Sequence, residues 1–441
     1  MKAIVTSSTS GRTVPVGLLA ATLVGLFAAV SACSDSTTGP TQGAAAANVL
    51  YVLSNNPAAG QNAVLGYTRA SDGTLTAMPG SPFLTGGTGV ANATQMLGPD
   101  DVDGPIRVSP DHRRLFAVNP RSNTIAVMNI ATNGALTSVA GSPFASGGVD
   151  PVSVALAGDK LYVVNQADDP AQSTTQLPNY TALSVSAGGQ LTPITGSTFT
   201  TVAGAVPSQA LLSPSHSILF GADFMAPVTP SHQGSLRSFA VGAGGTLTPA
   251  PGTPVDIPGA ADPMTHLVLG LAVHPTQNVL YAGYVTQNKL GVYKYDGTTG
   301  ALTFQTAVAN SGKAICWIVV NSSGSALYTT NTADNSISWY TATNAVAPAE
   351  AQHLVLKESG PLYTNPMGMM FPTSQAFQLA LDPAGKYLWV LSQHANPDFG
   401  ATNGNILHTV TIAADGSVSE PATPVHLPVD THTRPWGVVA F

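Results

Sequence analysis

One stretch decides the fold: GALTSVAGSPF, residues 134–144. Its core, Gly-x-Leu-Thr, returns at a nearly constant spacing, with leucines at positions 75, 136, 191, 247 and 302 that lie 61, 55, 56 and 55 residues apart. A looser copy puts Val418 a further 116 residues along, which equals two units of 58 residues with one unrecognised copy between them. A period of this length is typical of propeller blades or of solenoid coils, whose units bury their apolar faces only against one another.

Each unit contains four short apolar runs separated by turn residues, which predicts a four-stranded antiparallel sheet. In the second unit these runs are residues 106–108, 115–119, 124–130 and 136–139. The second run of each unit opens with leucine and an aromatic residue, and its seven copies begin at Leu50, Leu115, Leu161, Leu219, Leu280, Leu327 and Leu388. Seven copies predict seven blades.

The two ends of the repeat array predict how the ring closes. The first unit starts at its second strand, Leu50, whereas residues 434–441 look like an innermost strand with no successor. We therefore expect the C-terminal strand to complete the first blade. Such closure removes the open sheet edges that would otherwise invite aggregation.

The combined pattern also carries a resemblance. Pro-x-x-Val-x-x-(Ser/His/Asp)-Pro, Leu-Tyr-Val-x-Asn, Gly-x-Leu-Thr and Gly-Ser-Pro-Phe together resemble the lactonase-type seven-bladed β-propellers, a family similar to 6-phosphogluconolactonase and carboxymuconate cycloisomerase. The resemblance covers residues 48–441 and implies an all-β propeller of four-stranded antiparallel blades. Because one fold hosts many activities, it implies lactone chemistry less firmly.

The family's enzymes carry Arg-His on one innermost strand and a Glu after the Asn that ends the next strand, and this chain lacks both. Counting from the His274-Pro275 turn gives Leu269 and Gly270 at the Arg-His positions and Val285 at the Glu position. In other units the first pair is Gly104-Pro105, Ser208-Gln209, Cys316-Trp317 or Phe377-Gln378, and the Glu position holds Pro120, Gln166, Phe224, Thr332 or Gln393.

We therefore expect a binding or interaction module, whose ligand is a sugar, a lactone or an envelope protein. The alternative is a lactone hydrolase or cycloisomerase with a non-standard active site, and its candidate catalytic residues are Gln209, His266, Gln378, His432 and Arg434. A structural hydrogen-bonding role at the blade closure is a second interpretation of Arg434. Serine-hydrolase chemistry lacks its Gly-x-Ser-x-Gly motif.

Long connections are expected to mark the functional face. Turns after the first and third strands are short, while the long insertions follow the second or fourth strand and span residues 85–105, 167–180, 225–234, 359–374 and 395–404. Since the chain alternates direction within a blade, all five should gather on one face, around the channel mouth. The candidate binding residues in them are Asp101, Asp103, Asp168, Asp169, Met367, Met370 and Phe371.

Each of these candidates has a plainer interpretation. Asp101 and Asp103 could bind Ca²⁺, but an ordinary Asp-Gly turn is favoured because no later acidic ligand follows. Asp168 and Asp169 fit a solvated turn. The Met-rich stretch around Met370 fits either a partner-binding lid or a segment folded over the channel as core. No His-x-His or His-Glu-x-x-His spacing occurs, so we expect neither a metal nor a cofactor.

Composition limits the possible partners and the location. Charged residues make up 8% of the chain, against roughly 25% in an average globular protein. With 15 Lys and Arg and a net charge of −7, the chain has no basic stripe for nucleic acid. Cys316 lies in the apolar run 314–320, which predicts a buried structural thiol.

The N-terminus predicts export. Residues 1–32 have a basic start, an apolar run and the lipobox-like end Val-Ser-Ala before Cys33, the pattern of a lipoprotein signal peptide. We expect lipidation at Cys33, a flexible tether over residues 33–47, and a propeller over 48–441 in the cell envelope, held to a membrane only by its lipid. Ordinary cleavage and an uncleaved anchor are the alternatives.

Overall fold

The computed structural model describes residues 46–91, 100–169, 171–172, 174–228, 231–258, 266–364, 368–395, 404–430 and 432–441, without the side chains of 225–228 and 231–233. Cys33 and Met367 lie outside these residues. Residues 44–441 form one unit and are considered alone. No helix in the described ranges has the length and apolar character needed to span a membrane.

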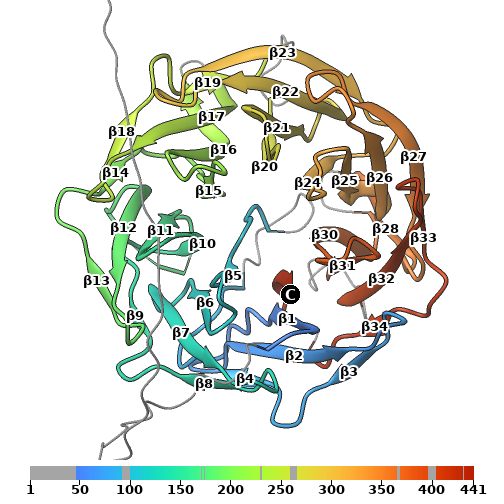
Figure 1. Ribbon diagram of the computed structural model, residues 1–441, viewed down its shortest axis with the longest axis horizontal. Coiled ribbons are helices and arrows are strands. Elements are labelled where there is room, and N and C mark those ends of the chain that lie inside the picture. Colours follow the sequence, from blue (N-terminus) through green and yellow to red (C-terminus); the bar gives the residue numbers. More distant parts are fainter. Residues whose placement is uncertain are drawn as a thin grey trace, which may run out of the picture. The chain divides into compact units, whose positions relative to one another are not determined.

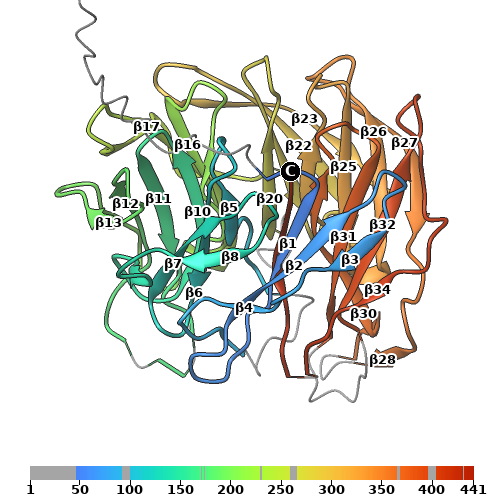
Figure 2. The ribbon, with the colours of Figure 1, turned by 60° about the horizontal axis from the view of Figure 1, so that its bottom comes forward.

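The described residues form a seven-bladed β-propeller (Figure 1). Each blade is an antiparallel sheet whose strands follow one another from the central channel to the rim. Each strand runs through the thickness of the ring (Figure 2). The strands of each blade are given from the channel outward. Blade 1 contains β35 (Trp436–Ala440), β1 (Val49–Leu53), β2 (Ala63–Arg69), β3 (Leu75–Ala77) and β4 (Phe83–Leu84), and blade 2 contains β5 (Ile106–Val108), β6 (Arg114–Asn119), β7 (Thr124–Ile130), β8 (Leu136–Ser138) and β9 (Phe144–Ala145). Blade 3 contains β10 (Pro151–Ala157), β11 (Lys160–Asn165), β12 (Asn179–Val185), β13 (Leu191–Pro193) and β14 (Phe199–Thr200), and blade 4 contains β15 (Leu211–Leu212), β16 (Ile218–Val228), β17 (Ser231–Val241), β18 (Leu247–Pro249) and β19 (Val255–Asp256).

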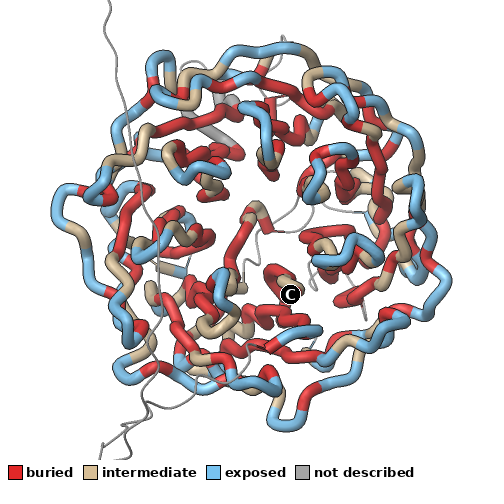
Figure 3. Tube along the Cα trace, viewed as in Figure 1, coloured by how far each residue is buried: buried red, intermediate tan, exposed pale blue. Residues whose placement is uncertain are grey.

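The remaining blades follow the same order. Blade 5 contains β20 (Val268–Val273), β21 (Val279–Tyr284), β22 (Lys289–Tyr295) and β23 (Leu302–Ala309). Blade 6 contains β24 (Ile315–Val320), β25 (Ala326–Asn331), β26 (Ser336–Thr341) and β27 (Ala349–Val355). Blade 7 contains β30 (Ser374–Leu381), β31 (Tyr387–His394), β32 (Ile406–Ile412), β33 (Val418–Ser419) and β34 (Val425–His426). A short 3₁₀ helix, η2 (Thr332–Asp334), follows β25. Inner strands are mostly buried and the outer rim is exposed (Figure 3).

The ring closes in blade 1, where the sequence places the closure. β35 pairs antiparallel with β1, with Tyr51 opposite Val439. Arg69 holds blades 7 and 1 together, because its guanidinium donates to Asp382 Oδ1 (2.7 Å) and to the Phe441 carbonyl (2.8 Å). The same guanidinium lies 4.7 Å from the centre of the Trp389 ring.

The repeated Gly-Ser-Pro-Phe motif builds the outermost strand in two pieces. β8 and β9 both pair with β7, and the gap between them is filled by Ser142, whose hydroxyl accepts the Val127 N–H at 2.9 Å. Ser81, Ser197 and Thr253 do the same for Gly66, Ala182 and Ser238. The hydroxyl therefore replaces a missing strand acceptor and keeps the backbone N–H satisfied.

The repeated Leu-Tyr pair connects neighbouring blades. The Tyr281 hydroxyl donates to the Ala345 carbonyl of the next blade at 2.9 Å, and Tyr328 donates to the Gly416 carbonyl at 3.1 Å. Tyr162 occupies the same position in blade 3, but its buried hydroxyl has no partner among the described residues. The motif thus supplies an inter-blade hydrogen bond in some blades and only packing in others.

Two of the long connections differ from the loops expected from the sequence. Residues 225–234 mostly extend β16 and β17, so blade 4 carries a long hairpin rather than a loop. Residues 359–374 contain a separate hairpin of β28 (Leu362–Thr364) and β29 (Met370–Pro372). β-branched and aromatic residues in these segments favour strands, and their pairing decides the outcome.

Candidate functional site

The segment at residues 100–105, which we call the plug, reaches from blade 2 into the centre of the ring (Figure 1). The Val102 carbonyl accepts from Trp317 Nε1 of blade 6 and from Gln378 Nε2 of blade 7, both at 2.8 Å. Its Asp103 N–H donates to the Ser208 carbonyl at 2.9 Å. Gly104 has a φ of 70°, but Asp103 forms an isolated bridge with Gln209 instead of the predicted Asp-Gly turn.

Asp100 anchors the plug to the blade closure. Its carboxylate accepts from Arg434 Nη1 (3.0 Å), Trp436 Nε1 (2.7 Å) and Gln393 Nε2 (3.0 Å). Both charged side chains are buried, at 3% and 7% exposed. Burial of an ion pair is tolerated when each remaining donor or acceptor finds a partner, and here it does. Arg434 therefore has the structural role given as its second interpretation.

An apolar hollow of about 290 Å³ lies beside the plug, between blades 5 and 6 on the loop-rich face. Its walls come from inner strands, from the loops that follow them and from the β28–β29 hairpin. They are lined by Phe224, Leu267, Leu269, Val285, Ala314, Cys316, Trp317, Ala333, Met369 and Phe371, with Asp101, Thr286, Asn288, Lys313 and Thr332 as the polar members. Cys316 is a buried free thiol, as predicted, and burial raises its pKa to about 12.

The family register locates this hollow. Leu269, Cys316 and Trp317 stand at the expected Arg-His positions, and Phe224, Val285 and Thr332 at the expected Glu positions. All six line it. The family's catalytic positions, counted along the sequence from the His-Pro turn, therefore coincide with the hollow, although none of the six residues there is charged.

The β28–β29 hairpin contains the Met-rich stretch. Tyr363 and Phe371 face each other across the hairpin with ring centroids 6.3 Å apart, and Phe371 lines the hollow. Leu362 and Met370 lie on its other side and are each 62% exposed. One side of the hairpin is therefore half-buried against the hollow, and the other is an exposed apolar surface.

Three carboxylates at the channel mouth lack an ion-pair partner among the residues described. Burial, followed by the charge of the neighbouring Asp168, raises the pKa of Asp101 to about 7. Burial and the charge of Asp169 raise the pKa of Asp150 to about 7. Burial also raises the pKa of Asp168. Groups with such shifts gather at functional sites more often than elsewhere.

Asp169 belongs to a different, satisfied pair. Its carboxylate accepts from Arg121 Nη2 (3.0 Å), the Ala171 N–H (2.9 Å) and Gln172 Nε2 (3.1 Å), and its side chain is fully buried. The solvated turn expected here is thus a buried ion pair. Asp103 lies deeper in the channel, where burial raises its pKa to about 7 against the opposing charge of Arg107.

The candidate catalytic residues do not come together in one group. Gln209 bonds through both amide atoms to the Leu271 backbone, at 3.2 and 2.7 Å, and Gln378 bonds to the plug. His266 is 6% exposed, and its ring nitrogens have no hydrogen-bond partner in the described part of the chain. His432 is exposed and donates its backbone N–H to Asp430.

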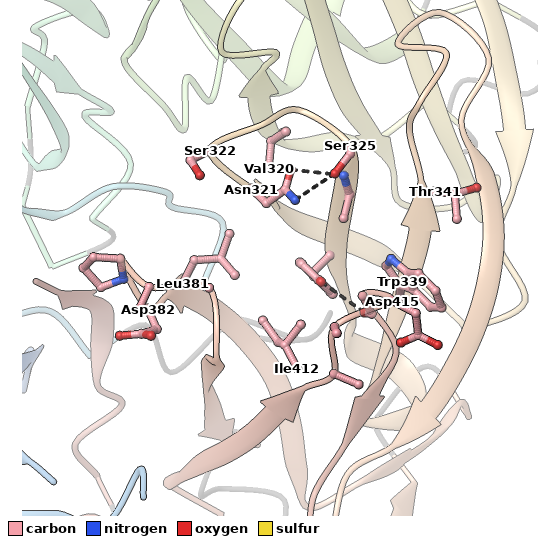
Figure 4. Close-up of a pocket in the computed structure, with 18 of the residues that line it drawn as sticks. Val320, Asn321, Ser322, Ser325, Trp339, Thr341, Leu381, Asp382, Ile412 and Asp415 are labelled. Carbon is pink, nitrogen blue, oxygen red and sulfur yellow. Dashed lines mark hydrogen bonds between the residues drawn. The ribbon is translucent and has the colours of Figure 1, made fainter. Parts of the chain in front are cut away.

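A second hollow of about 630 Å³ opens on the opposite, short-turn face between blades 6 and 7 (Figure 4). Asn321 and Ser325 lie on one side of it, and Trp339 and Asp415 on another. Trp339 pairs with Tyr328, at a register position that holds Gly66, Val127, Ala182, Ser238, Val292 or Thr409 in the other blades. The indole therefore enlarges this one inter-blade contact. Exposed turns form the rim of this hollow, and the buried side chains of Tyr328 and Trp339 form its inner wall.

Comparisons with known proteins agree with this fold. The matching family model is that of the lactonase seven-bladed β-propellers, over residues 268–395. The periplasmic gluconolactonase of Pseudomonas aeruginosa is 16% identical, with a TM-score of 0.61 over 86% of this chain and 96% of its own. A Bacteroides uniformis protein named as a candidate 6-phosphogluconolactonase is 15% identical, with a TM-score of 0.61 over 88% and 98%. No curated protein matches the chain.

These matches show a lactonase-type propeller architecture, since structural likeness at such low identity is evidence of fold alone. Among the described residues, no group of three or more His, Cys, Asp or Glu side chains could hold a metal ion. The apolar hollow and the carboxylates beside it are the features that bear on function.

Proposed function

We propose that this protein is an exported, lipid-anchored propeller that binds a small ligand with an apolar body in the hollow between blades 5 and 6. The lining carries the proposal. Leu269, Cys316 and Trp317 stand where the resemblance implies catalytic groups, and they form an apolar wall. Pockets of this kind bind by removing apolar ligand area from water, while a few polar groups fix the orientation.

A blocking variant tests this proposal. Thr286 lines the hollow and is exposed, so Thr286→Trp should fill the opening without disturbing the core. Thr343→Trp makes the same change at the hollow of the opposite face. The full chain, screened against neutral aromatic and lactone probes by thermal unfolding, should gain stability from a binder, and only Thr286→Trp should abolish the gain. Equal gains in both variants would contradict the proposal.

Lactone hydrolysis is the second candidate function, and Asp101 favours it. A carboxylate whose pKa is about 7, set beside an apolar hollow, is poised to act as a general base toward water. The gluconolactonase of Pseudomonas aeruginosa shares the fold and acts on a lactone. A phosphorylated lactone suits the site less well, because Asp101, Asp150 and Asp168 surround the mouth with negative charge.

Kinetics separates the two functions. If the chain is a lactonase, neutral sugar lactones should turn over with a rate that rises through pH 7 as Asp101 loses its proton. Asp101→Asn should remove that turnover while ligand-induced stabilisation persists. Turnover unaffected by Asp101→Asn but lost in His432→Ala would move the chemistry to the residues predicted from sequence.

The anchoring part of the proposal rests on residues 1–47. Mass spectrometry of the mature protein should find acyl chains on Cys33 and none of residues 1–32. Cys33→Ala should move the protein from the membrane fraction to the soluble exported fraction. A mature chain that keeps residues 1–32 would contradict lipoprotein processing.

A further inference from the structure

The charges around the apolar hollow are unbalanced. Asp100 is neutralised by Arg434 and Asp169 by Arg121, each within hydrogen-bond distance. Asp101, Asp150 and Asp168 form no ion pair within the described ranges. Besides burial, the charge of Asp168 raises the pKa of Asp101, and the charges of Asp168 and Asp101 raise the pKa of Asp150. Above about pH 7, where Asp101 and Asp150 are ionised, the mouth therefore carries an excess of negative charge.

Lys313 is the cation that lines the hollow, and it offsets this excess only weakly. Its side chain is exposed to water, which screens the charge. Its backbone N–H also donates to Asp334 Oδ2 at 3.2 Å, so a carboxylate lies close to the lysine itself. The wall opposite the plug consequently does not form a site for an anion.

One acceptor in this acidic mouth is left without a donor. Asp150 is 4% exposed, and its Oδ1 has no hydrogen-bond partner among the described residues, while Oδ2 accepts the Asp168 N–H at 3.4 Å. A buried unpaired acceptor is costly, and it is relieved by a donor or a positive charge placed nearby. Asp150 and Asp101 line the same narrow recess, and Asp101 also lines the hollow.

Aromatic side chains complete the arrangement. Trp317, Phe224 and Phe371 line the hollow, and the Trp317 ring is held against Phe377 with centroids 4.4 Å apart. Aromatic faces attract cations as well as apolar groups, most strongly when water is excluded. A hollow of about 290 Å³ takes an aromatic or branched aliphatic body with a short polar end.

We propose that this hollow selects ligands that carry a positive charge on a small apolar body, such as an aryl-alkyl amine, with the ammonium group at Asp101 and the body against Trp317 and Phe371. The inference rests on the proposed binding function and names its ligand class. Anions of the same shape are disfavoured by the three unneutralised carboxylates.

Three probes of nearly equal shape test the charge preference: 2-phenylethylamine, 2-phenylethanol and phenylacetate. Binding to the full chain is measured by calorimetry at pH 8 and low salt. The amine should bind at least about tenfold more tightly than the acid, with the alcohol between them. Asp101→Asn should weaken the binding of the amine and leave the binding of the alcohol unchanged. Retained binding of the alcohol also shows that the variant is folded. Asp415→Asn, at the opposite face, should change none of the three.

The pH dependence gives a second readout. The charged groups that face Asp101 are Asp100, Asp150, Asp168 and Arg434, with Lys313 across the hollow. Because Asp101 is protonated in acid, amine affinity should rise between pH 5.5 and 8, and that rise should disappear in Asp101→Asn.

The outcomes distinguish the two proposals. Alcohol binding that is blocked by Thr286→Trp, together with an amine no tighter than the acid, would overturn the charge preference and leave the binding function standing. Failure of all three probes to bind at millimolar concentration would overturn both. An amine preference that survives Asp101→Asn would place the cation elsewhere and would equally overturn this assignment.

Discussion

On the loop-rich face, the plug and the β28–β29 hairpin contribute walls to a hollow of about 290 Å³ that is mainly apolar. On the short-turn face, turns of a few residues surround a hollow of about 630 Å³ whose walls carry hydroxyl, amide and carboxylate groups. The larger hollow is open to water on its polar groups, so a ligand there would gain little from desolvation. The smaller one combines burial with unneutralised charge, and it is the better candidate site.

The largest effect should come from the anchor of the plug. Asp100→Asn keeps the shape of the side chain but leaves Arg434 buried without its counter-charge. Breaking a buried pair in this way costs about 3–5 kcal/mol of unfolding free energy. The measurement is denaturant unfolding, with Asp415→Asn of the opposite face as control; that exposed residue should matter little. Equal losses of unfolding free energy in the two variants would contradict the expectation that the buried ion pair of the loop-rich face contributes more to stability.

The free energy of unfolding should depend on pH through the buried carboxylates of the loop-rich face. The folded-state pKa values of Asp101 and Asp150 are about 7, against 3.8 for an unperturbed Asp. The folded protein therefore holds protons that the unfolded chain releases, and the stability contributed by these groups falls as pH rises from about 4 to about 7. Comparing urea midpoints at pH 5 and 8 should give a smaller fall for Asp101→Asn than for the unsubstituted chain. An unchanged fall would show that Asp101 is not desolvated.

The short-turn face can be tested at its packing against Trp339. Gly416 has a φ of 95°, and an added Cβ would lie 2.8 Å from the indole. Gly252 has a φ of 80° and nothing within 4 Å of an added Cβ. Alanine costs about 1 kcal/mol at either site for its left-handed backbone, and Gly416→Ala should cost about 1 kcal/mol more for the clash. Thermal unfolding of the two variants measures this difference.

The smallest effect should come from the tyrosine hydrogen bonds between neighbouring blades, which belong to neither face in particular. Tyr281→Phe removes a hydroxyl that donates to Ala345, which should cost about 1 kcal/mol. Tyr162→Phe removes a buried hydroxyl that has no partner in the described residues, and it should be neutral or slightly stabilising. A loss of similar size in both would mean that Tyr162 bonds in solution.

Much of this fold follows from local sequence signals. Gly134, at φ of 83°, turns the chain into β8, and Ser142 completes the outermost strand, so the repeat that contains both predicts the blades and their order. The closure by β35 follows from counting strands. Long connections after the second and fourth strands also correctly predict which face carries the cavities near the plug.

The candidate site depends on contacts that no local pattern encodes. The Asp101–Gly104 segment has the sequence of an ordinary turn, and its position in the channel depends on donors from Trp317 and Gln378, more than 200 residues away. Arg121 likewise neutralises Asp169 from a neighbouring blade. Leu269 and Cys316 were located by the family register, but as missing catalytic residues; only the structure makes them the wall of a cavity.

In a ring of blades, stability ordinarily comes from each unit and its two neighbours, so that folding can begin anywhere and spread. The plug changes this, because one short segment at the entrance of blade 2 bonds to Ser208 of blade 4, Trp317 of blade 6 and Gln378 of blade 7. Those partners are distant in sequence, so we expect the contacts to form after the blades that hold them, at a cost in loop-closure entropy. The plug thereby links blades that share no border.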